Sequence, residues 1–333
     1  MSRNSRSRND RNTLVQTTAL GLCAWLLINT ASAQQSFSRQ TVADTIEYSY
    51  QWQDENRQPQ SLSFALNQAD IASLPTTQRN YQTAVAQRHV VVSLFHHART
   101  YDPKQVRIDI RPNGDLIDIE VSSRFPEKIV EYQAQMRERE QQAYAEYLRK
   151  NYYERYRTQM NEKAIKPDHL RYVEESTRAL IPLSQALYEK LDASSDAREY
   201  INLMLTWLQS IPYSTLTDRV ATNGSGFLPP ISLLNQNKGD CDSKTVLAAA
   251  IIRAFLPNVP LRMVFLPNHA LLAVNLTAAA HDQTIMIDGL NYILMEPTGP
   301  SLMLLGEAGA DSMLAINRDQ FTTQAVLPAR PAN

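Results

Sequence analysis

The chain has 333 residues, of which 43% are hydrophobic and 20% are charged, and its formal net charge at pH 7 is −1. This length suits two domains of ordinary size, and the composition is typical of a globular protein. A net charge near zero provides no overall field for binding nucleic acid or an anionic membrane surface, so the partner has to be inferred from a local site.

The two ends of the chain differ in composition from the rest. Four arginines between Arg3 and Arg11 precede a mostly apolar stretch from Leu14 to Ile28, and Ala31-Ser32-Ala33 has the small residues of a cleavage site, which is the pattern of a secretory signal peptide over residues 1–33. A retained membrane anchor is the alternative, but the apolar stretch is shorter than the roughly 20 residues that a spanning helix needs. We therefore expect a periplasmic or secreted mature protein. Residues 325–333 contain two prolines and are expected to form a loose tail.

Residues 41–125 have the pattern of a small α+β domain. Apolar and polar residues alternate from Ile46 to Trp52 and again from Leu62 to Leu66, which predicts a hairpin. Helical spacing follows over 77–100, and a second hairpin is expected around Pro112-Asn113-Gly114-Asp115. We expect these elements to form one small sheet with one helix, in a domain that contacts the substrate or a partner.

Residues 126–175 are highly charged and rich in Tyr, Gln, Arg and Glu. A ragged stripe that includes Ile129, Tyr132 and Met136 predicts a long solvated helix. We interpret it as a charged connector, with tyrosines that pack rather than bind. The catalytic domain would then follow over 176–310.

The most informative motif is Gly239-Asp240-Cys241-Asp242-Ser243-Lys244, which opens an apolar helical run that ends at Phe255. A buried structural cysteine is one reading, but two flanking aspartates are unusual beside an apolar position. If Cys23 is removed with the signal segment, Cys241 is the single cysteine of an exported chain and cannot form an internal disulfide. We therefore predict that Cys241 is a nucleophile. The helix start and an imidazolium from His269 are expected to lower its pKa.

A cysteine nucleophile needs an imidazole to take its proton and a third group to orient that imidazole. His269 begins a strand-like run after the Cys241 helix, and Glu296 ends a second run further on. Asp288 is the competing acid, but Asp-Gly between two alternating apolar runs is a strong hairpin signal. We predict Cys241, His269 and Glu296 as the catalytic residues, with Asp288 in a turn.

These motifs resemble the transglutaminase-like superfamily. The matching segments are 239–244, Asn268-His269-Ala270, Glu296-Pro297-Thr298-Gly299 and the upstream Trp207–Tyr213, and the likeness extends over roughly 176–306. The resemblance implies an α+β protein with a papain-like core, in which the cysteine begins a helix that packs on an antiparallel sheet. It also implies an exported cysteine peptidase or amidase. The family usually has Asp in the third position, where this chain has Glu.

In the mechanism that the resemblance implies, Cys241 attacks a peptide or carboxamide carbonyl to form a thioester, and His269 moves the proton. The Cys241 backbone N–H is expected to donate to the oxyanion, and Gln209, Tyr213 and Gln236 are polar candidates for a second donor. Water as acceptor would make a peptidase or amidase, and an amine would make a protein-crosslinking transglutaminase. A catalytically inactive peptide-binding domain is the third reading. The expected partner is a protein or peptide, such as an envelope protein or a peptidoglycan peptide.

No metal site or cofactor is predicted. His96 and His97 are adjacent in a helical run, so they face different directions and do not readily share one metal ion. Asp240 and Asp242 have oxygens that could contribute to a calcium site. We interpret this acidic pair instead as charge at a helix start.

Overall fold

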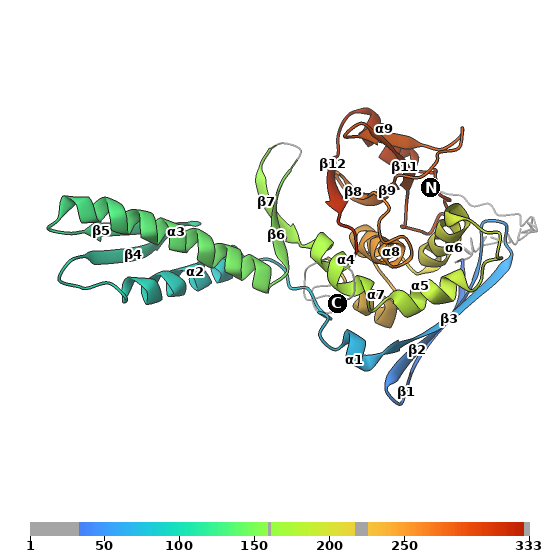
Figure 1. Ribbon diagram of the computed structural model, residues 1–333, viewed down its shortest axis with the longest axis horizontal. Coiled ribbons are helices and arrows are strands. Elements are labelled where there is room, and N and C mark those ends of the chain that lie inside the picture. Colours follow the sequence, from blue (N-terminus) through green and yellow to red (C-terminus); the bar gives the residue numbers. More distant parts are fainter. Residues whose placement is uncertain (1–32, 159–160, 217–225, 330–333) are drawn as a thin grey trace, which may run out of the picture. The chain divides into compact units, whose positions relative to one another are not determined.

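The computed structural model describes residues 33–158, 161–216 and 226–329 (Figure 1). In this part of the chain the protein is α+β and its strands pair antiparallel. The segment that was predicted to be a signal peptide lies outside the described residues, apart from Ala33. No helix within the described ranges is both long and apolar enough to cross a membrane.

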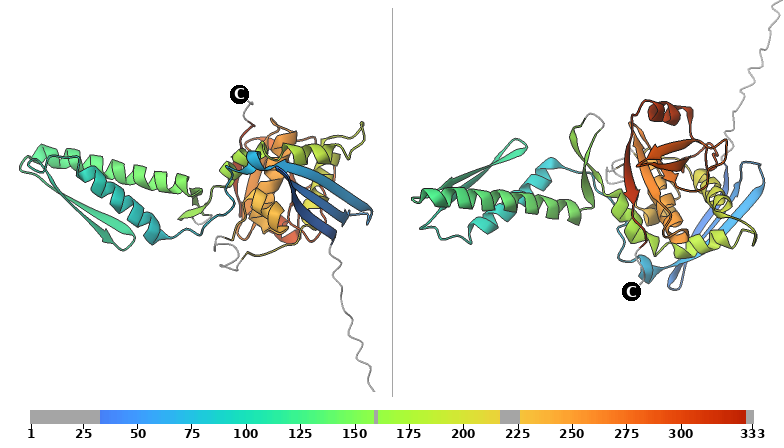
Figure 2. Two further views of the ribbon diagram at one scale, coloured as in Figure 1. Left: turned by 90° about the horizontal axis from the view of Figure 1, so that it is seen from below. Right: turned by 45° about the horizontal axis from the view of Figure 1, so that its top comes forward.

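The first sheet has three strands, β1 (Gln34–Val42), β2 (Thr45–Gln53) and β3 (Pro59–Asn67), and it contains the first predicted hairpin. Its inner face is buried through the alternating aromatic and aliphatic side chains that predicted the strands. Tyr50 and Phe64 meet Trp207 edge-on, with ring centroids 5.3 and 6.5 Å apart. This sheet therefore shares the main hydrophobic core with the C-terminal half of the chain, and both views in Figure 2 place it against helices α5 (Ile181–Tyr188) and α6 (Ala197–Ser210).

A second, smaller core lies among α2 (Thr83–Ala98), β4 (Arg107–Asn113), β5 (Leu116–Ser122) and α3 (Pro126–Lys150). The second predicted hairpin is confirmed, with Gly114 at φ 57° in its turn. Leu94, Ile119 and Met136 are buried in this cluster. The residues expected to form one domain over 41–125 thus contribute to two different cores, because the alternation of a strand identifies its buried face but not what covers that face.

The charged region 126–175 is not a single helix. Helix α3 ends at Lys150, and Tyr152 takes the left-handed conformation with φ 56°. The chain then forms the hairpin of β6 (Tyr153–Arg157) and β7 (Lys163–Pro167), followed by α4 (His169–Thr177). Tyr153 and Tyr156, which lie within the region predicted to be helical, are residues that also favour strands. Both lie in β6.

The main core also contains one face of a five-stranded sheet with the order β10-β11-β9-β8-β12, and a separate smaller cluster covers the other face. The strands are β8 (Leu261–Leu266), β9 (His269–Val274), β10 (Thr284–Ile287), β11 (Leu290–Met295) and β12 (Thr322–Val326). Helix α8 (Cys241–Phe255) packs on one face, and α9 (Ala310–Asn317) packs on the other. The short helices α1 (Gln68–Ile71) and α7 (Pro230–Gln236) complete the described elements.

The prediction of a loose tail over 325–333 is wrong for its first residues. Ala325 and Val326 are paired in β12, where Val326 lies opposite Leu261. The buried guanidinium of Arg253 donates to the Val326 carbonyl at 2.9 Å, and Ala329 N donates to Pro257 O at 3.0 Å. These hydrogen bonds hold residues 326–329 against the end of α8. No pattern in the local sequence predicts them.

Candidate functional site

Cys241 is the first residue of α8, as the sequence predicted. The N-cap is Asp240, whose carboxylate accepts a hydrogen bond from Ser243 N at 3.0 Å and a second from the Ser243 hydroxyl. This is the usual N-cap arrangement, in which a side-chain oxygen satisfies an unpaired amide of the first turn. Asp240 therefore has a structural role at the helix start.

His269 and Glu296 are brought together by the pairing of β9 with β11. His269 begins β9, and Glu296 follows Met295, which lies opposite Leu272 in the ladder. Nε2 of His269 is 3.5 Å from Oε1 of Glu296. The ring nitrogen Nδ1 is then the one left to accept a proton from a thiol.

Glu296 is buried, with 6% of its surface exposed. Burial alone raises the pKa of its carboxyl, but hydrogen bonds from His269 and Ser312, the charge of His269 and the Gly309 N–H at 3.2 Å outweigh it, so the net pKa is lowered. Ser312 and Gly309 come from the start of α9. The sequence analysis missed both residues, and their positions in the chain carry no signal that links them to Glu296.

Asp288 lies where it was expected, in the two-residue turn between β10 and β11 with φ 51°. Its carboxylate contacts Arg262 at 2.5 Å, and it does not line the cavity that contains Cys241. Of the two acids considered, Glu296 is the one that contacts His269.

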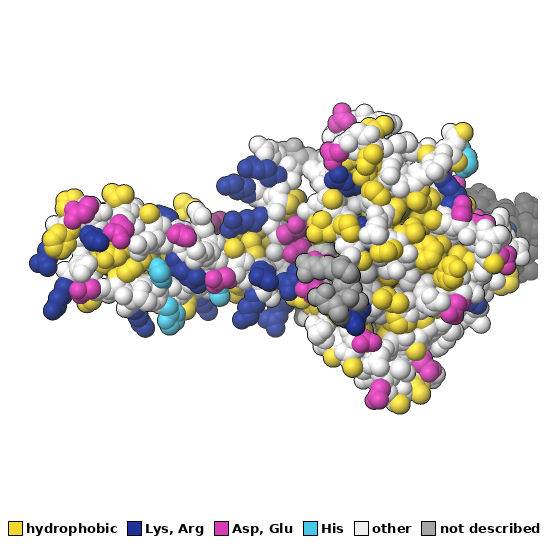
Figure 3. All heavy atoms as spheres, viewed as in Figure 1, with side chains coloured by type: hydrophobic (Ala, Val, Ile, Leu, Met, Phe, Trp, Pro, Cys, Tyr) yellow, Lys and Arg dark blue, Asp and Glu magenta, His cyan; other side chains and the backbone are white. Residues whose placement is uncertain are grey.

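Cys241 and His269 line one cavity of about 490 Å³, which we call the Cys241 cavity. Its other walls are the β6–β7 hairpin, with Tyr156 and Lys166, and the first half of β12. On the face shown in Figure 3, Lys and Arg side chains gather over the β6–β7 hairpin and the adjoining end of α3. Lys166 lies over the ring of Phe265, 3.4 Å from its centroid, and also contacts Glu154 at 3.4 Å.

The thiol of Cys241 is not a resting thiolate. Burial raises its pKa to about 12, and the charges of Asp242 and Asp240 act in the same direction, while a hydrogen bond with the Ala270 backbone opposes them. The Sγ–H group points to Asp242 Oδ1 at 3.6 Å. The predicted lowering of the pKa is therefore wrong, because desolvation and two carboxylates outweigh the helix dipole. The thiol needs a base to lose its proton at neutral pH.

The three candidates for a second oxyanion donor differ in their hydrogen bonds, exposure and position. Gln209 uses its amide on backbone groups, donating to Glu296 O at 2.7 Å and Met303 O at 2.8 Å. Gln236 is exposed at the end of α7. Tyr213 pairs through its backbone with Gly239, and burial and then the charge of Cys241 raise the pKa of its hydroxyl. Tyr213 is thus the candidate that lies beside the nucleophile.

His169 is a further residue of the Cys241 cavity that the sequence analysis missed. It is 1% exposed, its ring packs between Phe227 and Phe265, and its Nε2 is 3.6 Å from Asp242 Oδ2. Burial lowers the pKa of His169 to about 4, against the attraction of Asp242. The Asp242 carboxylate therefore contacts Cys241 through one oxygen and the neutral imidazole of His169 through the other.

The described ranges contain no group of three or more His, Cys, Asp or Glu side chains arranged to hold a metal ion. His97 contacts the Tyr101 hydroxyl at 2.9 Å, and Asp240 is used in its cap. Comparisons of the chain with protein-family models, with curated proteins and with solved structures each gave no match.

Proposed function

We propose that this protein is an exported cysteine peptidase or amidase with a transglutaminase-like fold. The observation that carries the proposal is the convergence of three elements: the N-terminus of α8 with Cys241, the start of β9 with His269, and the end of β11 with Glu296. A nucleophile, a base and a buried acid that orients the base are the parts of a cysteine acyl-transfer site. The packing of α8 on an antiparallel sheet agrees with the fold that the sequence resemblance implies.

In the proposed mechanism, Nδ1 of His269 takes the thiol proton as the sulfur attacks a carbonyl carbon. Negative charge then develops on the carbonyl oxygen, near the free backbone N–H groups at the start of α8 and the hydroxyl of Tyr213. The imidazolium is stabilised by Glu296 and returns its proton to the leaving amine, which breaks the C–N bond and leaves a thioester on Cys241. Water, activated by His269, hydrolyses the thioester.

One observation favours a second candidate, a domain that binds peptides without turning them over. A thiol whose pKa is about 12 carries very little thiolate at pH 7, so general-base transfer to His269 has to provide the nucleophile. If that transfer does not occur, the cavity remains as a binding site only.

The test uses the mature protein beginning at Gln34. It is incubated with unfolded protein and with glutaminyl peptides, and three products are measured: new amino termini for a peptidase, ammonia for an amidase, and incorporation of a fluorescent primary amine for a transglutaminase. We expect hydrolysis that is lost in Cys241→Ala and His269→Ala. If none of the products forms with either substrate, the catalytic proposal is wrong and the binding alternative stands.

The N-terminal pattern supports export, so the intact mass of the exported protein is expected to correspond to a chain that begins at Gln34. A chain that begins at Met1 would favour a retained anchor instead.

A further inference from the structure

Strand β12 is an edge strand that pairs only with β8. The hydrogen bond from Asn275 N to Pro260 O, at 2.9 Å, sets the phase of the β8–β9 ladder. Because hydrogen-bonding directions alternate along an antiparallel strand, the odd-numbered residues of β8 direct their backbone groups to the even-numbered residues of β12. The N–H and C=O groups of Thr323 and Ala325 therefore point away from the sheet.

These outward groups have no hydrogen-bond partner in the part of the chain that the structure describes. The strand reads Thr-Thr-Gln-Ala-Val, without a charge or a proline, and Ala325 is exposed. Natural proteins usually protect an edge of this kind with Lys, Pro, a bulge or a covering segment, because free backbone groups pair readily with another strand. The outer edge of β12 is thus competent to accept a strand.

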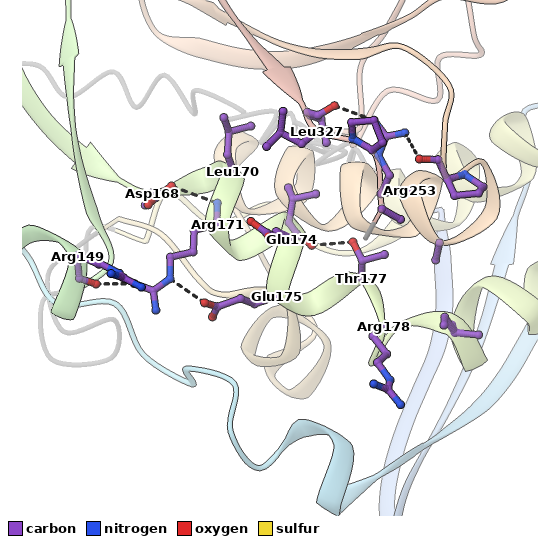
Figure 4. Close-up of a pocket in the computed structure, with 17 residues that line it drawn as sticks. Arg149, Asp168, Leu170, Arg171, Glu174, Glu175, Thr177, Arg178, Arg253 and Leu327 are labelled. Atoms are coloured by element: carbon purple, nitrogen blue, oxygen red, sulfur yellow. Dashed lines mark hydrogen bonds and ion pairs between the residues drawn. The ribbon is translucent and has the colours of Figure 1, made fainter. Parts of the chain in front are cut away.

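The two ends of this edge open into two different cavities. Thr322, Thr323 and Gln324 line the Cys241 cavity. Val326 and Leu327 line a second cavity of about 910 Å³, shown in Figure 4, which we call the α4 groove because Leu170, Val173 and other residues of α4 form its opposite wall. A five-residue strand spans about 16 Å at roughly 3.3 Å per residue, so β12 leads directly from one cavity to the other.

The side chain of Gln324 connects β12 to the β6–β7 hairpin. Gln324 lies on the same face of the sheet as α8, where it accepts from Lys166 at 2.9 Å and donates to Glu154 at 3.1 Å. These contacts involve side chains only, so they use none of the outward backbone groups of β12. The α4 groove adds the apolar side chains of Leu170 and Leu327 and a rim of mixed charge, where Arg171 contacts Glu175 at 2.7 Å.

We propose that the outer edge of β12 binds an extended polypeptide substrate as an added strand, which runs from the scissile bond at Cys241 to the α4 groove. The proposal rests on the proposed function for the role of Cys241, and it names the substrate class: an unfolded or extended polypeptide with about five residues on one side of the bond. A small carboxamide or a compact folded domain could not use this edge. Affinity would come from main-chain hydrogen bonds, and selectivity from the groove.

The test measures binding separately from turnover. A library of random 12-residue peptides is selected on the full mature chain with Cys241→Ala, and the affinity of the selected peptides is measured by fluorescence anisotropy. Ala325→Pro removes an outward N–H without breaking a bond to β8, because proline is tolerated where an edge N–H faces solvent. Met286→Pro is the matched control: it makes the same change at an outward-facing, exposed position of β10, the opposite edge of the same sheet.

We expect Ala325→Pro to weaken binding of the selected peptides at least tenfold and Met286→Pro to change it less than twofold. In a second measurement, a selected peptide is N-methylated at one backbone amide at a time. Its binding to the protein that carries only Cys241→Ala should weaken when the methyl group is at every second residue. This measurement decides the matter if Ala325→Pro does not fold. The proposal is overturned if no peptide is selected, if both proline variants bind alike, or if N-methylation has no period of two. Formation of new amino termini or ammonia by the protein that retains Cys241 reports on the catalytic site independently, so the two proposals can fail separately.

Discussion

Replacing Asp242 by Asn should make the Cys241 thiol markedly more reactive. Asp242 Oδ1 is 3.6 Å from Sγ, and two unit charges at that separation repel by about 4.6 kcal/mol at an effective dielectric constant of 20 and about 1.2 kcal/mol at 80. The Asp242 side chain is 36% exposed, so solvent screening places the repulsion toward the lower value, at about 2 kcal/mol. A free-energy difference of about 1.4 kcal/mol changes an acid dissociation constant tenfold. Loss of this repulsion should therefore lower the pKa of the thiol by about 1.5. The thiolate fraction at neutral pH should then rise about 30-fold.

The assay is the rate of alkylation by iodoacetamide between pH 6 and pH 10, followed by intact mass. The matched control is Asp288→Asn, which removes the same charge at the β10–β11 turn, where Asp288 contacts Arg262. Asp242→Asn should react about 30-fold faster than the parent protein at pH 7.5, and Asp288→Asn should react at the parent rate. A change of less than threefold in Asp242→Asn, or an equal change in both variants, would refute the view that this carboxylate holds the proton on the thiol.

Three further predictions concern the groups around the site. Glu296→Gln should lower turnover by roughly 10²- to 10⁴-fold, and Asp288→Asn should leave it within twofold; the reverse order would require a different third residue. Ser312→Ala removes a hydrogen-bond donor to Glu296, so the pKa of Glu296 should rise. The acid limb of the profile of kcat/KM against pH should then move to higher pH. An unchanged limb would contradict the view that Ser312 stabilises the Glu296 carboxylate. His169 has a folded pKa of about 4 against 6.5 unfolded, so its contribution to stability is complete above pH 6.5 and is lost as pH falls toward 4. His169→Phe should therefore reduce the loss of unfolding free energy between pH 7 and pH 4.5 by about 2 kcal/mol in urea titrations, whereas His281→Phe, at an 82% exposed side chain, should keep the parent slope.

Local patterns in the sequence predicted local features well. The alternation in β2 and β3, the Asp288-Gly289 turn and the start of α8 after Asp240 are all found in the structure. Each of these depends on residues that are neighbours in the chain, through side-chain alternation, positive φ or capping. His269 meets Glu296 because β11 pairs with β9 as well as with β10, an arrangement that the sequence resemblance implied and the local patterns do not contain.

Features that depend on distant segments were not predictable in this way. The β1–β3 sheet was assigned to a separate domain because nothing near Tyr50 indicates that Trp207 covers it. His169 comes from an element far along the chain from Asp242, and Ser312 comes from a separate helix that begins after Glu296. The lowered thiol pKa was expected from the helix start and a neighbouring His269 imidazolium, whereas burial and the charges of two carboxylates raise it.

At the start of α8, the residue that stabilises the helix also disfavours a thiolate on Cys241. A carboxylate at 240 caps the helix, which typically contributes about 1 kcal/mol, but its charge opposes an anion on Cys241. Burial, and then the charge of Asp242, raise the pKa of Asp240 to about 7, so near neutral pH this residue carries a proton in part of the molecules and opposes the thiolate less. A serine would cap the helix without any such cost. Flanking carboxylates on both sides of the cysteine therefore suit a thiol that keeps its proton at rest. In the proposed mechanism, such a thiol becomes a nucleophile only when His269 removes that proton in the presence of a bound carbonyl.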